Sequence, residues 1–321
     1  METTKYDVVI VGGGAAGLSA ALVLGRARRR VLVVDAGAPR NAPAAHMQGF
    51  LSRDGMPPRE LLAVGRAEVA RYGVEILDGT VVCIEVLVVD DPEGAGGIEH
   101  RVVLSGGVEL TARRVLVTTG VSDEIPEVSG VRERWGRDLL HCPYCHGWEV
   151  RDEPLGVLGS IPGSVQHALL VRQWSADVVF FAHAYDTTAA EREQLEARGI
   201  RIVTGEVTRL VVESDRLTGV ELADGRVVER TAVFVRPGIH PHPDGLLAGL
   251  GCEMDQTGFV KVDATGRTTS PGVWAAGNVA DPRAQVITAA GAGSAAAIAI
   301  NADLVQAEVD RALRSSAPDV A

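Results

Sequence analysis

The sequence has no apolar run as long as the roughly 18 residues that a membrane-spanning helix needs. Its first five residues also lack the basic and then apolar layout of a signal peptide. Lysine is nearly absent, since Lys5 and Lys261 are the only two, and acidic residues outnumber basic ones to give a net charge of −11. That charge disfavours nucleic acid and anionic membranes as partners. We therefore expect a cytoplasmic protein with neither a membrane nor a nucleic-acid partner.

Cysteine is scarce as well, and the four present are Cys83, Cys142, Cys145 and Cys252. In a reducing cytosol a close cysteine pair is more often catalytic or metal-binding than structural. A structural zinc site needs four ligands, commonly from two such pairs. His141 and His146 could complete a Cys2His2 set, but four ligands within six consecutive residues do not easily surround one tetrahedral ion. We predict redox chemistry and no metal site.

The close pair, Cys142 and Cys145, is separated by two residues. This spacing lets a small disulfide ring close and reopen, so the pair can carry two electrons, and it tends to lower one thiol pKa. His141 and His146 flank the pair and can exchange protons near neutral pH. One hypothesis makes either histidine the base that deprotonates incoming thiols. In the alternative, a histidine only hydrogen-bonds or caps this segment.

The N-terminus carries a dinucleotide-binding fingerprint. A buried β-branched strand is predicted at 6–11, followed at once by a G-x-G-x-x-G turn and an apolar helix. In such a turn Gly12 allows a tight bend, Gly14 lets the backbone approach a pyrophosphate, and Gly17 lets helix and strand pack closely. The helix N-terminus favours the anion. Asp35 ends the second strand and can accept hydrogen bonds from a ribose hydroxyl.

The length of 321 residues suggests about two domains. A second βαβ pattern begins near residue 155, with a strand at 178–181. Further segments are predicted as a helix at 60–72, strands at 81–89, 101–104, 108–110 and 115–120, and a long small-residue helix at about 285–309.

Four segments together resemble low-molecular-weight thioredoxin reductase-type flavoproteins over nearly the whole chain. They are Val11 to Gly17, Thr118-Thr119-Gly120 with Ile125-Pro126, the Cys142–Cys145 pair, and Thr269 to Asn278 running on to Gly291. The resemblance implies an α/β fold with two Rossmann-like dinucleotide-binding domains, the second inserted in the first. FAD would bind the split domain at 1–120 and 243–321. The inserted domain at 121–242 would carry the cysteine pair and bind NADPH.

The same resemblance implies residue roles. Cys145 would face the flavin, and Cys142 would exchange with the substrate. The final helix would direct its N-terminus at the flavin ring, where it can stabilise the anionic reduced form. A homodimer is also implied. The cofactor-binding residues expected on this basis are Gly12, Gly14, Ala15, Ala16, Gly17, Asp35, Arg40, Asn41, Thr119, Gly120, Gly277, Asn278, Gln285 and Val286.

The second nucleotide site departs from the family pattern. Ile161 stands at the second-glycine position of the turn 159–164, where a side chain obstructs a pyrophosphate. No arginine follows the strand at 178–181; His183 is a poor clamp for a 2′-phosphate and Asp186 would repel it. The alternative is that Arg172 or Arg201 takes over this role. We expect a degraded or altered site, which leaves binding of NADPH or NADH open.

Two further differences from the reductase pattern bear on the predicted function. His146 stands where the reductases usually carry an acid, and Asn278 stands where they carry an aspartate. Histidines beside the redox pair resemble the thioredoxin reductase-like dithiol oxidases, which pass electrons from small natural products through FAD to oxygen. We therefore predict an FAD-dependent oxidase of a small-molecule dithiol. The alternatives are an NAD(P)H-dependent reductase of thioredoxin or a small disulfide, and a non-catalytic flavin redox sensor.

Overall fold

The computed structural model describes residues 5–89 and 97–315. It divides into two compact units, the first made of 1–40, 59–122 and 240–321, and the second of 41–58 and 123–239. The predicted domain bounds differ mainly at 41–58, which the sequence placed with the first domain. Within the second unit this loop packs on Gly136, where a Cβ atom would lie 2.9 Å from the Cβ of Pro43.

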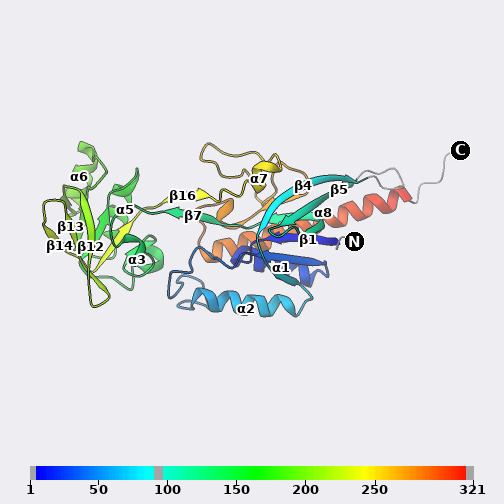
Figure 1. The fold of residues 1–321 in the computed structure, drawn as a ribbon, viewed down its shortest axis with the longest axis horizontal. Coiled ribbons are helices and arrows are strands. Elements are labelled where there is room, and N and C mark those ends of the chain that lie inside the picture. Colours follow the sequence, from blue (N-terminus) through cyan, green and yellow to red (C-terminus); the bar gives the residue numbers. More distant parts are fainter. Residues whose placement is uncertain (1–4, 90–96, 316–321) are drawn as a thin grey trace. The chain divides into compact units, whose positions relative to one another are not determined.

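The first unit contains most of the long strands and the longest helix (Figure 1). Its elements are β1 (Lys5–Val11), α1 (Ala15–Arg26), β2 (Val31–Asp35), α2 (Pro58–Ala70), β3 (Glu75–Asp78), β4 (Val81–Val89), β5 (Gly97–Leu104), β6 (Glu109–Val117), α7 (Leu246–Gly249), β17 (Val273–Ala275), the 3-10 helix η1 (Gly277–Val279) and α8 (Val286–Ser315). Two further strands, β7 (Val121–Glu124) and β16 (Gly238–Pro241), pair with each other and contain two of the points at which the chain passes from one unit to the other.

One sheet organises this unit, in the order β3-β2-β1-β6-β5-β4, with β17 paired to β6 outside that path. β1, β2, β3, β6 and β17 are parallel to one another. β5 pairs antiparallel with both β6 and β4. Alternate residues of β1 enter two cores: Val8 and Ile10 pack with α1 and α8, and Val9 and Val11 pack on the other face. Because parallel strands end at one edge, the segments after β1, β6 and β17 meet there.

β6 is one continuous strand, so the prediction of two strands at 108–110 and 115–120 is wrong. The polar residues that interrupted the apolar pattern are Arg113 and Arg114. Arg113 pairs with Asp7 at 2.9 Å and Glu308 at 2.8 Å, and Arg114 pairs with Asp303 at 2.5 Å. These long-range ion pairs let a half-buried strand carry two charges.

α8 is long and apolar enough, by length and composition alone, to cross a membrane. The helix meets this criterion although Thr288, Ser294 and Asn301 interrupt its apolar residues, so it is not the continuous apolar run that the sequence analysis looked for. However, one side of the helix, including Gly293, Ala297 and Ile300, is buried in the core of the unit. A Cβ atom on Gly293 would lie 2.0 Å from the backbone oxygen of Ala16 in α1. This close crossing packs one side of α8 directly against α1.

The second unit has shorter elements. They are α3 (Val131–Arg134), β8 (Leu139–Leu140), α4 (Pro143–His146), β9 (Leu155–Leu158), α5 (Ser164–Val171), β10 (Val178–Phe181), α6 (Ala189–Ala197), β11 (Arg201–Val203), β12 (Val207–Glu213), β13 (Arg216–Leu222), β14 (Val227–Glu229) and β15 (Ala232–Val235).

A parallel sheet in the order β11-β10-β9-β15-β8 forms the centre of the second unit. One face packs on α5 and α6 through residues such as Val165 and Leu195, and the other packs on the antiparallel sheet β12-β13-β14. The strand ends place four segments at one edge: those beginning at His141, Gly159 and Ala182, and the one after Val235. The cysteine pair and the second nucleotide turn therefore share one edge of one sheet.

Candidate functional site

The glycine turn after β1 has the close contacts that the sequence predicted. Gly12 has φ +109°, and a Cβ atom there would lie 2.5 Å from the Thr118 carbonyl oxygen. A Cβ atom on Gly17 would lie only 1.9 Å from the Gly12 carbonyl oxygen. The Thr118 hydroxyl bonds the carbonyl oxygens of Val11 and Gly12 at 3.0 and 2.8 Å. Thr118, which the sequence analysis did not include among the site residues, therefore stabilises the conformation of the turn.

Gly14 differs from its neighbours because its side faces open space. It is the N-cap of α1, and no described side chain caps the helix there. A Cβ atom on Gly14 would meet nothing within 4 Å in the described part of the chain. Backbone N–H groups at an uncapped helix start bind anions. The turn therefore fits the pyrophosphate of a dinucleotide, and Ala15 and Ala16 form the first turn of that helix.

Asp35 lies beside this turn at the end of β2. Its Oδ1 accepts the N–H of Gly13 at 3.1 Å and that of Gly37 at 3.2 Å. Its Oδ2 pairs with Arg66 of α2, which also reaches Asp78 at 3.1 Å. The carboxylate is thus fixed by three donors from the chain itself. Its predicted bond to a ribose hydroxyl stays a prediction.

The segment from η1 to α8 is shaped by Asn278. The Asn278 amide donates to the backbone oxygens of Asp281 at 3.0 Å and Ala284 at 2.9 Å. A carboxylate could not donate either bond, so the asparagine side chain gives this loop an internal support. The Arg40 guanidinium also donates to it, at the Pro282 backbone oxygen, 3.3 Å away. Gly277, with φ +78°, precedes the asparagine.

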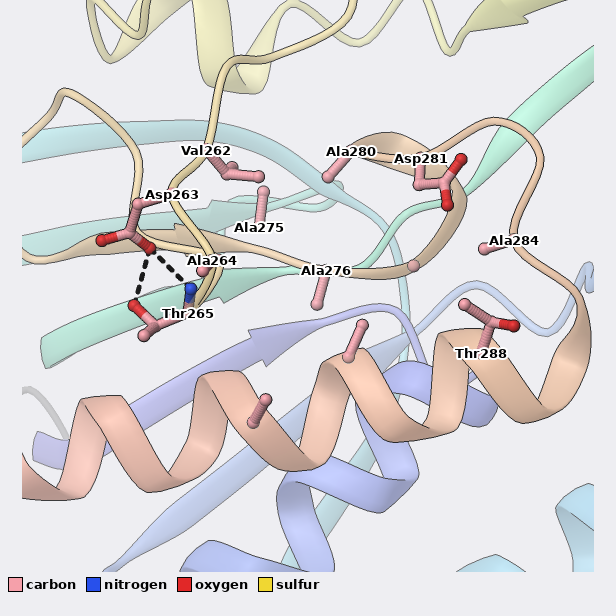
Figure 2. A pocket seen from close by; sticks show the side chains of 14 residues that line it. Val262, Asp263, Ala264, Thr265, Ala275, Ala276, Ala280, Asp281, Ala284 and Thr288 are labelled. Atoms are coloured by element: carbon pink, nitrogen blue, oxygen red, sulfur yellow. Dashed lines mark hydrogen bonds between the residues drawn. The ribbon is translucent and has the colours of Figure 1, made fainter.

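A pocket lined almost entirely by small side chains lies on one side of Gly277 (Figure 2). It is bounded by the turn 262–266 and by α8, from which Thr288 contributes. The turn is fixed by the Asp263 carboxylate, which accepts from the Thr265 hydroxyl at 2.6 Å and its N–H at 2.8 Å. At the start of α8, Gln285 is exposed and Val286 half-buried. Within the first unit, the N-terminus of α8, which the sequence predicts to face the flavin, is therefore accessible to solvent.

Asn41, Thr119 and Gly120 complete the predicted cofactor set. Thr119 and Gly120 are half-buried and directly follow Thr118, at the same sheet edge as the glycine turn. Asn41 belongs to the second unit, where its backbone oxygen accepts the N–H of Ala44 at 3.1 Å. Its contact with a cofactor stays a prediction.

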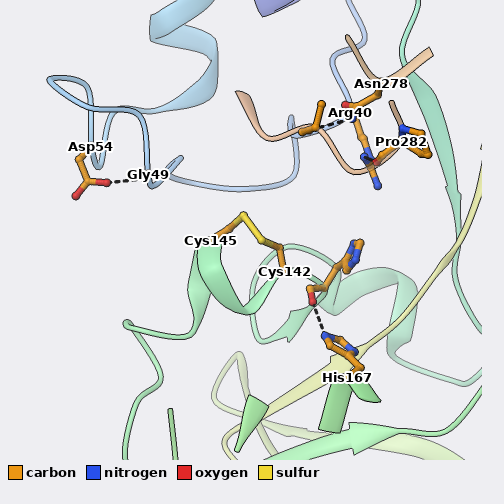
Figure 3. Close-up of a disulfide and its surroundings, with 10 residues drawn as sticks. Arg40, Gly49, Asp54, Cys142, Cys145, His167, Asn278 and Pro282 are labelled. Atoms are coloured by element: carbon orange, nitrogen blue, oxygen red, sulfur yellow. Dashed lines mark hydrogen bonds between the residues drawn. A yellow bond between two sulfur atoms is a disulfide. The ribbon is translucent and has the colours of Figure 1, made fainter. Parts of the chain in front are cut away.

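In the second unit the structure joins Cys142 and Cys145 by a disulfide (Figure 3). Cys142 is extended and forms the N-cap of the four-residue helix α4. Its carbonyl oxygen accepts the N–H groups of Cys145 and His146, each at 3.1 Å. Both cysteines are half-buried, so the disulfide is closed and partly accessible. Such a pair can undergo exchange with an incoming thiolate.

His146, directly after the pair, is half-buried. Burial lowers its pKa below the usual value, and the negative charge of Glu149 opposes this shift only partly. The imidazole is therefore uncharged at neutral pH and can accept a proton, as a general base must. On the other side of the pair, the His141 backbone oxygen accepts a hydrogen bond at 2.9 Å from His167. The catalytic roles of His141 and His146 stay predictions.

His167 was missed by the sequence analysis. It lies on α5, is nearly fully buried, and stacks edge-on against the rings of His141 and Phe234, each 6.1 Å away. The pKa of His167 is lowered to about 4, chiefly by burial and to a smaller extent by nearby His141 and Arg236. A histidine in an apolar helix usually signals core packing, so only its three-dimensional position identifies it.

We expect His167 to make the protein acid-sensitive. Its folded pKa of about 4 lies below the ordinary 6.5, so the unfolded chain binds the proton more tightly. The stabilisation is complete above pH 6.5 and is lost as the pH falls toward 4; from pH 7 to pH 5 the loss is about 2 kcal/mol. Urea unfolding at both pH values should show this drop, and His167→Gln should reduce it. An equal drop in the variant would contradict the assignment.

In the second nucleotide turn, residues 159–164, side chains of the protein itself contact the backbone. The Ser164 hydroxyl accepts the N–H groups of Ser160 and Ile161, both at 3.3 Å, and donates to the Ile161 oxygen at 2.7 Å. A Cβ atom on Gly163 would lie 2.3 Å from the guanidinium of Arg236. Two N–H groups of the turn, those of Ser160 and Ile161, are thus already bonded, and the Arg236 side chain lies against Gly163. The start of α5 itself has no side-chain cap among the described residues.

The remaining candidates for a 2′-phosphate clamp are also engaged elsewhere. His183 Nδ1 accepts the Val207 N–H at 3.0 Å, and burial lowers the pKa of His183, so it stays uncharged. The positions of Arg172 and Arg201 do not favour the alternative that one of them takes this role. Arg172 bonds backbone oxygens of Arg198 and Ser175, near the far end of α5, and Arg201 begins β11, away from its carboxyl end. Ligands bind at the carboxyl ends of such strands.

Within residues 5–89 and 97–315, no group of three or more His, Cys, Asp or Glu side chains could hold a metal ion.

Known proteins match this chain over most of its length. The family model described as pyridine nucleotide-disulphide oxidoreductase matches residues 6–294. Thioredoxin reductase sirT of Leptosphaeria maculans is 32% identical, covering 95% of this chain and 96% of its own. The crystal structure of HlmI is 57% identical with a TM-score of 0.94, covering 99% of this chain and 98% of its own. A putative thioredoxin reductase TrxB from Bacillus anthracis is 33% identical with a TM-score of 0.85, covering 94% and 99%.

Proposed function

Because this chain belongs to the pyridine nucleotide-disulphide oxidoreductase family and is a thioredoxin reductase-like flavoprotein, we propose that it oxidises a small-molecule dithiol. The acceptor of the electrons is O2. The observation that carries the proposal is the second nucleotide turn, in which Ser164 bonds the N–H groups and Arg236 covers Gly163. Without a pyridine nucleotide, reducing equivalents enter through the cysteine pair.

The reaction at the cysteine pair balances as a dithiol–disulfide exchange. A substrate thiolate attacks the Sγ of Cys142, the bond to Cys145 breaks, and a mixed disulfide forms. The second substrate thiol then attacks the mixed disulfide, so the substrate leaves as a disulfide and both cysteines are reduced. His146, uncharged at neutral pH, accepts a thiol proton. With oxygen as acceptor, dithiol and O2 become disulfide and hydrogen peroxide.

FAD is the cofactor proposed for the first unit. When bound, it takes two electrons from the reduced cysteine pair and transfers them to oxygen. The open face of Gly14 and the uncapped start of α1 would hold the pyrophosphate, and Asp35 would orient the ribose. Asn278 keeps the loop before α8 in shape, and the N-terminus of α8 would face the ring. A homodimer remains a proposal from family resemblance.

The second candidate is an NAD(P)H-dependent reductase of thioredoxin or a small disulfide. It is favoured by the family description and by the relatives named thioredoxin reductase. The guanidinium of Arg236 beside Gly163 also places one positive charge at the turn. Binding there, however, requires both Arg236 and Ser164 to give up their present positions.

Flavin absorbance distinguishes the two candidates. We expect dithiothreitol to bleach the flavin of the purified holoprotein under argon within seconds, and air to restore the colour. NADPH and NADH, added separately, should bleach it at least about 100-fold more slowly, the size of effect that losing positioned binding contacts produces. The matched control is Ser164→Ala, which frees two N–H groups of the turn. Prompt bleaching of the unmodified protein by either nucleotide would establish the reductase instead.

A further inference from the structure

The helix of the second nucleotide turn contacts the segment that leads into the cysteine pair. β8 ends at Leu140, directly before His141, and β9 ends before the turn that starts α5. Both strands point to the same edge, with only β15 between them. From the second turn of α5, the His167 ring reaches the His141 backbone oxygen at 2.9 Å (Figure 3).

We propose that His167 is a positioning residue: it holds the peptide between His141 and Cys142 so that Cys142 meets an incoming thiolate in one fixed geometry. The inference rests on the proposed function in taking Cys142 as the sulfur that exchanges with substrate. α5 thus supports the segment that leads into the reactive disulfide.

The hydrogen bond fixes which nitrogen of His167 carries the proton. A carbonyl oxygen only accepts, so Nε2 is the donor. Nδ1 then presents a lone pair, and it has no partner among the described residues. The charged or titratable groups facing this ring are His141 before the cysteines and Arg236 after β15, and both disfavour a second proton. His167 therefore stays a neutral donor throughout the pH range in which thiols react.

The ring also sets the orientation of His141. His167 is clamped by Phe234 on one side and presents its ring edge-on to His141 on the other, with interplanar angles of 87° and 86°. One side chain thus contacts His141 through both its backbone and its ring. Because His141 is adjacent to Cys142, displacement of His167 moves the sulfur that meets the substrate.

The test compares His167→Phe, which keeps an edge-on ring but cannot donate, with His167→Gln, which can donate to the same oxygen. The holoprotein is mixed with dithiothreitol under argon, quenched with an alkylating agent, and the mass shift of the opened disulfide is followed in time. We expect His167→Phe to open the disulfide about tenfold more slowly, as one lost hydrogen bond predicts. His167→Gln should remain within about threefold of the unmodified rate, the range expected for a replaced bond.

His183→Asn is the matched control, since His183 is a histidine of the same unit that accepts a backbone N–H away from the cysteines. It should leave the opening rate unchanged even if the melting temperature falls. An unchanged rate in His167→Phe, or equal slowing in His167→Gln, overturns the positioning role. If dithiothreitol opens the disulfide normally but never bleaches the flavin, the proposed function fails and the positioning role stands. If the unmodified disulfide is never opened, both fail.

Discussion

Cys145→Ser abolishes dithiol-driven bleaching of the flavin, and Cys142 of the variant forms a mixed disulfide when a disulfide reagent is supplied. Without the Cys145 thiol, no disulfide can form within the protein, so electrons cannot leave the pair. We expect turnover to fall by at least about 10³-fold, as removal of one member of a catalytic unit does. Cys142 remains as a thiol and can capture one substrate sulfur when an oxidised substrate is supplied.

Mass spectrometry of the intact protein gives the measurement. Cys145→Ser incubated with 2-hydroxyethyl disulfide should gain the mass of one mercaptoethanol unit, as Cys142 forms a mixed disulfide and one mercaptoethanol leaves, and reduction should remove it. Cys142→Ser is the matched control, because it loses turnover to the same extent without a stable adduct on Cys145. An adduct on Cys142→Ser and none on Cys145→Ser would reverse the assigned roles of the two cysteines.

The cysteine pair and the first glycine turn were predictable because their chemistry is local in the sequence. Two cysteines at this spacing form a disulfide inside one helical turn, and Gly12 and Gly17 lie within six residues of each other. The conformation that each requires is set by neighbours along the chain. The structure accordingly shows the disulfide and both close contacts.

Residues that act across the fold were not predictable in the same way. His167 is separated from His141 by 26 positions, and it contacts His141 because their segments leave the same sheet edge. Arg236 reaches Gly163 for the same reason. Ser164 could have been suspected, since a serine at a helix start often bonds nearby N–H groups. The continuity of β6 was hidden because Arg113 finds its partners in β1 and α8.

Substitutions at two glycines near the start of α1, Gly14 and Gly17, distinguish an effect on cofactor binding from an effect on folding. In Gly17→Ala the new methyl group would lie 1.9 Å from the Gly12 oxygen, so β1 and α1 must move apart. We expect the free energy of unfolding to fall by about 3 kcal/mol, the upper part of the usual range for overpacking. The protein should be purified without flavin, because the turn that would hold the pyrophosphate is distorted.

Gly14→Ala should leave the fold intact and still lose the flavin. Gly14 has φ −75° and ψ −172°, which alanine adopts readily, and the added Cβ meets nothing within 4 Å in the described chain. The free energy of unfolding of the flavin-free protein should therefore change by no more than about 0.5 kcal/mol. The same methyl group would stand where the pyrophosphate approaches the backbone, so the ratio of flavin to protein absorbance should fall.

Gly249→Ala in α7 is the matched control for both variants, because its added Cβ also has nothing within 4 Å in the described residues. It should retain full flavin content and an unchanged urea midpoint. Full flavin content in Gly14→Ala would mean that the cofactor is held without close approach to this turn. That result would remove the structural basis for placing the pyrophosphate at the start of α1. The packing argument for Gly17 is tested separately, by the urea unfolding curve of Gly17→Ala.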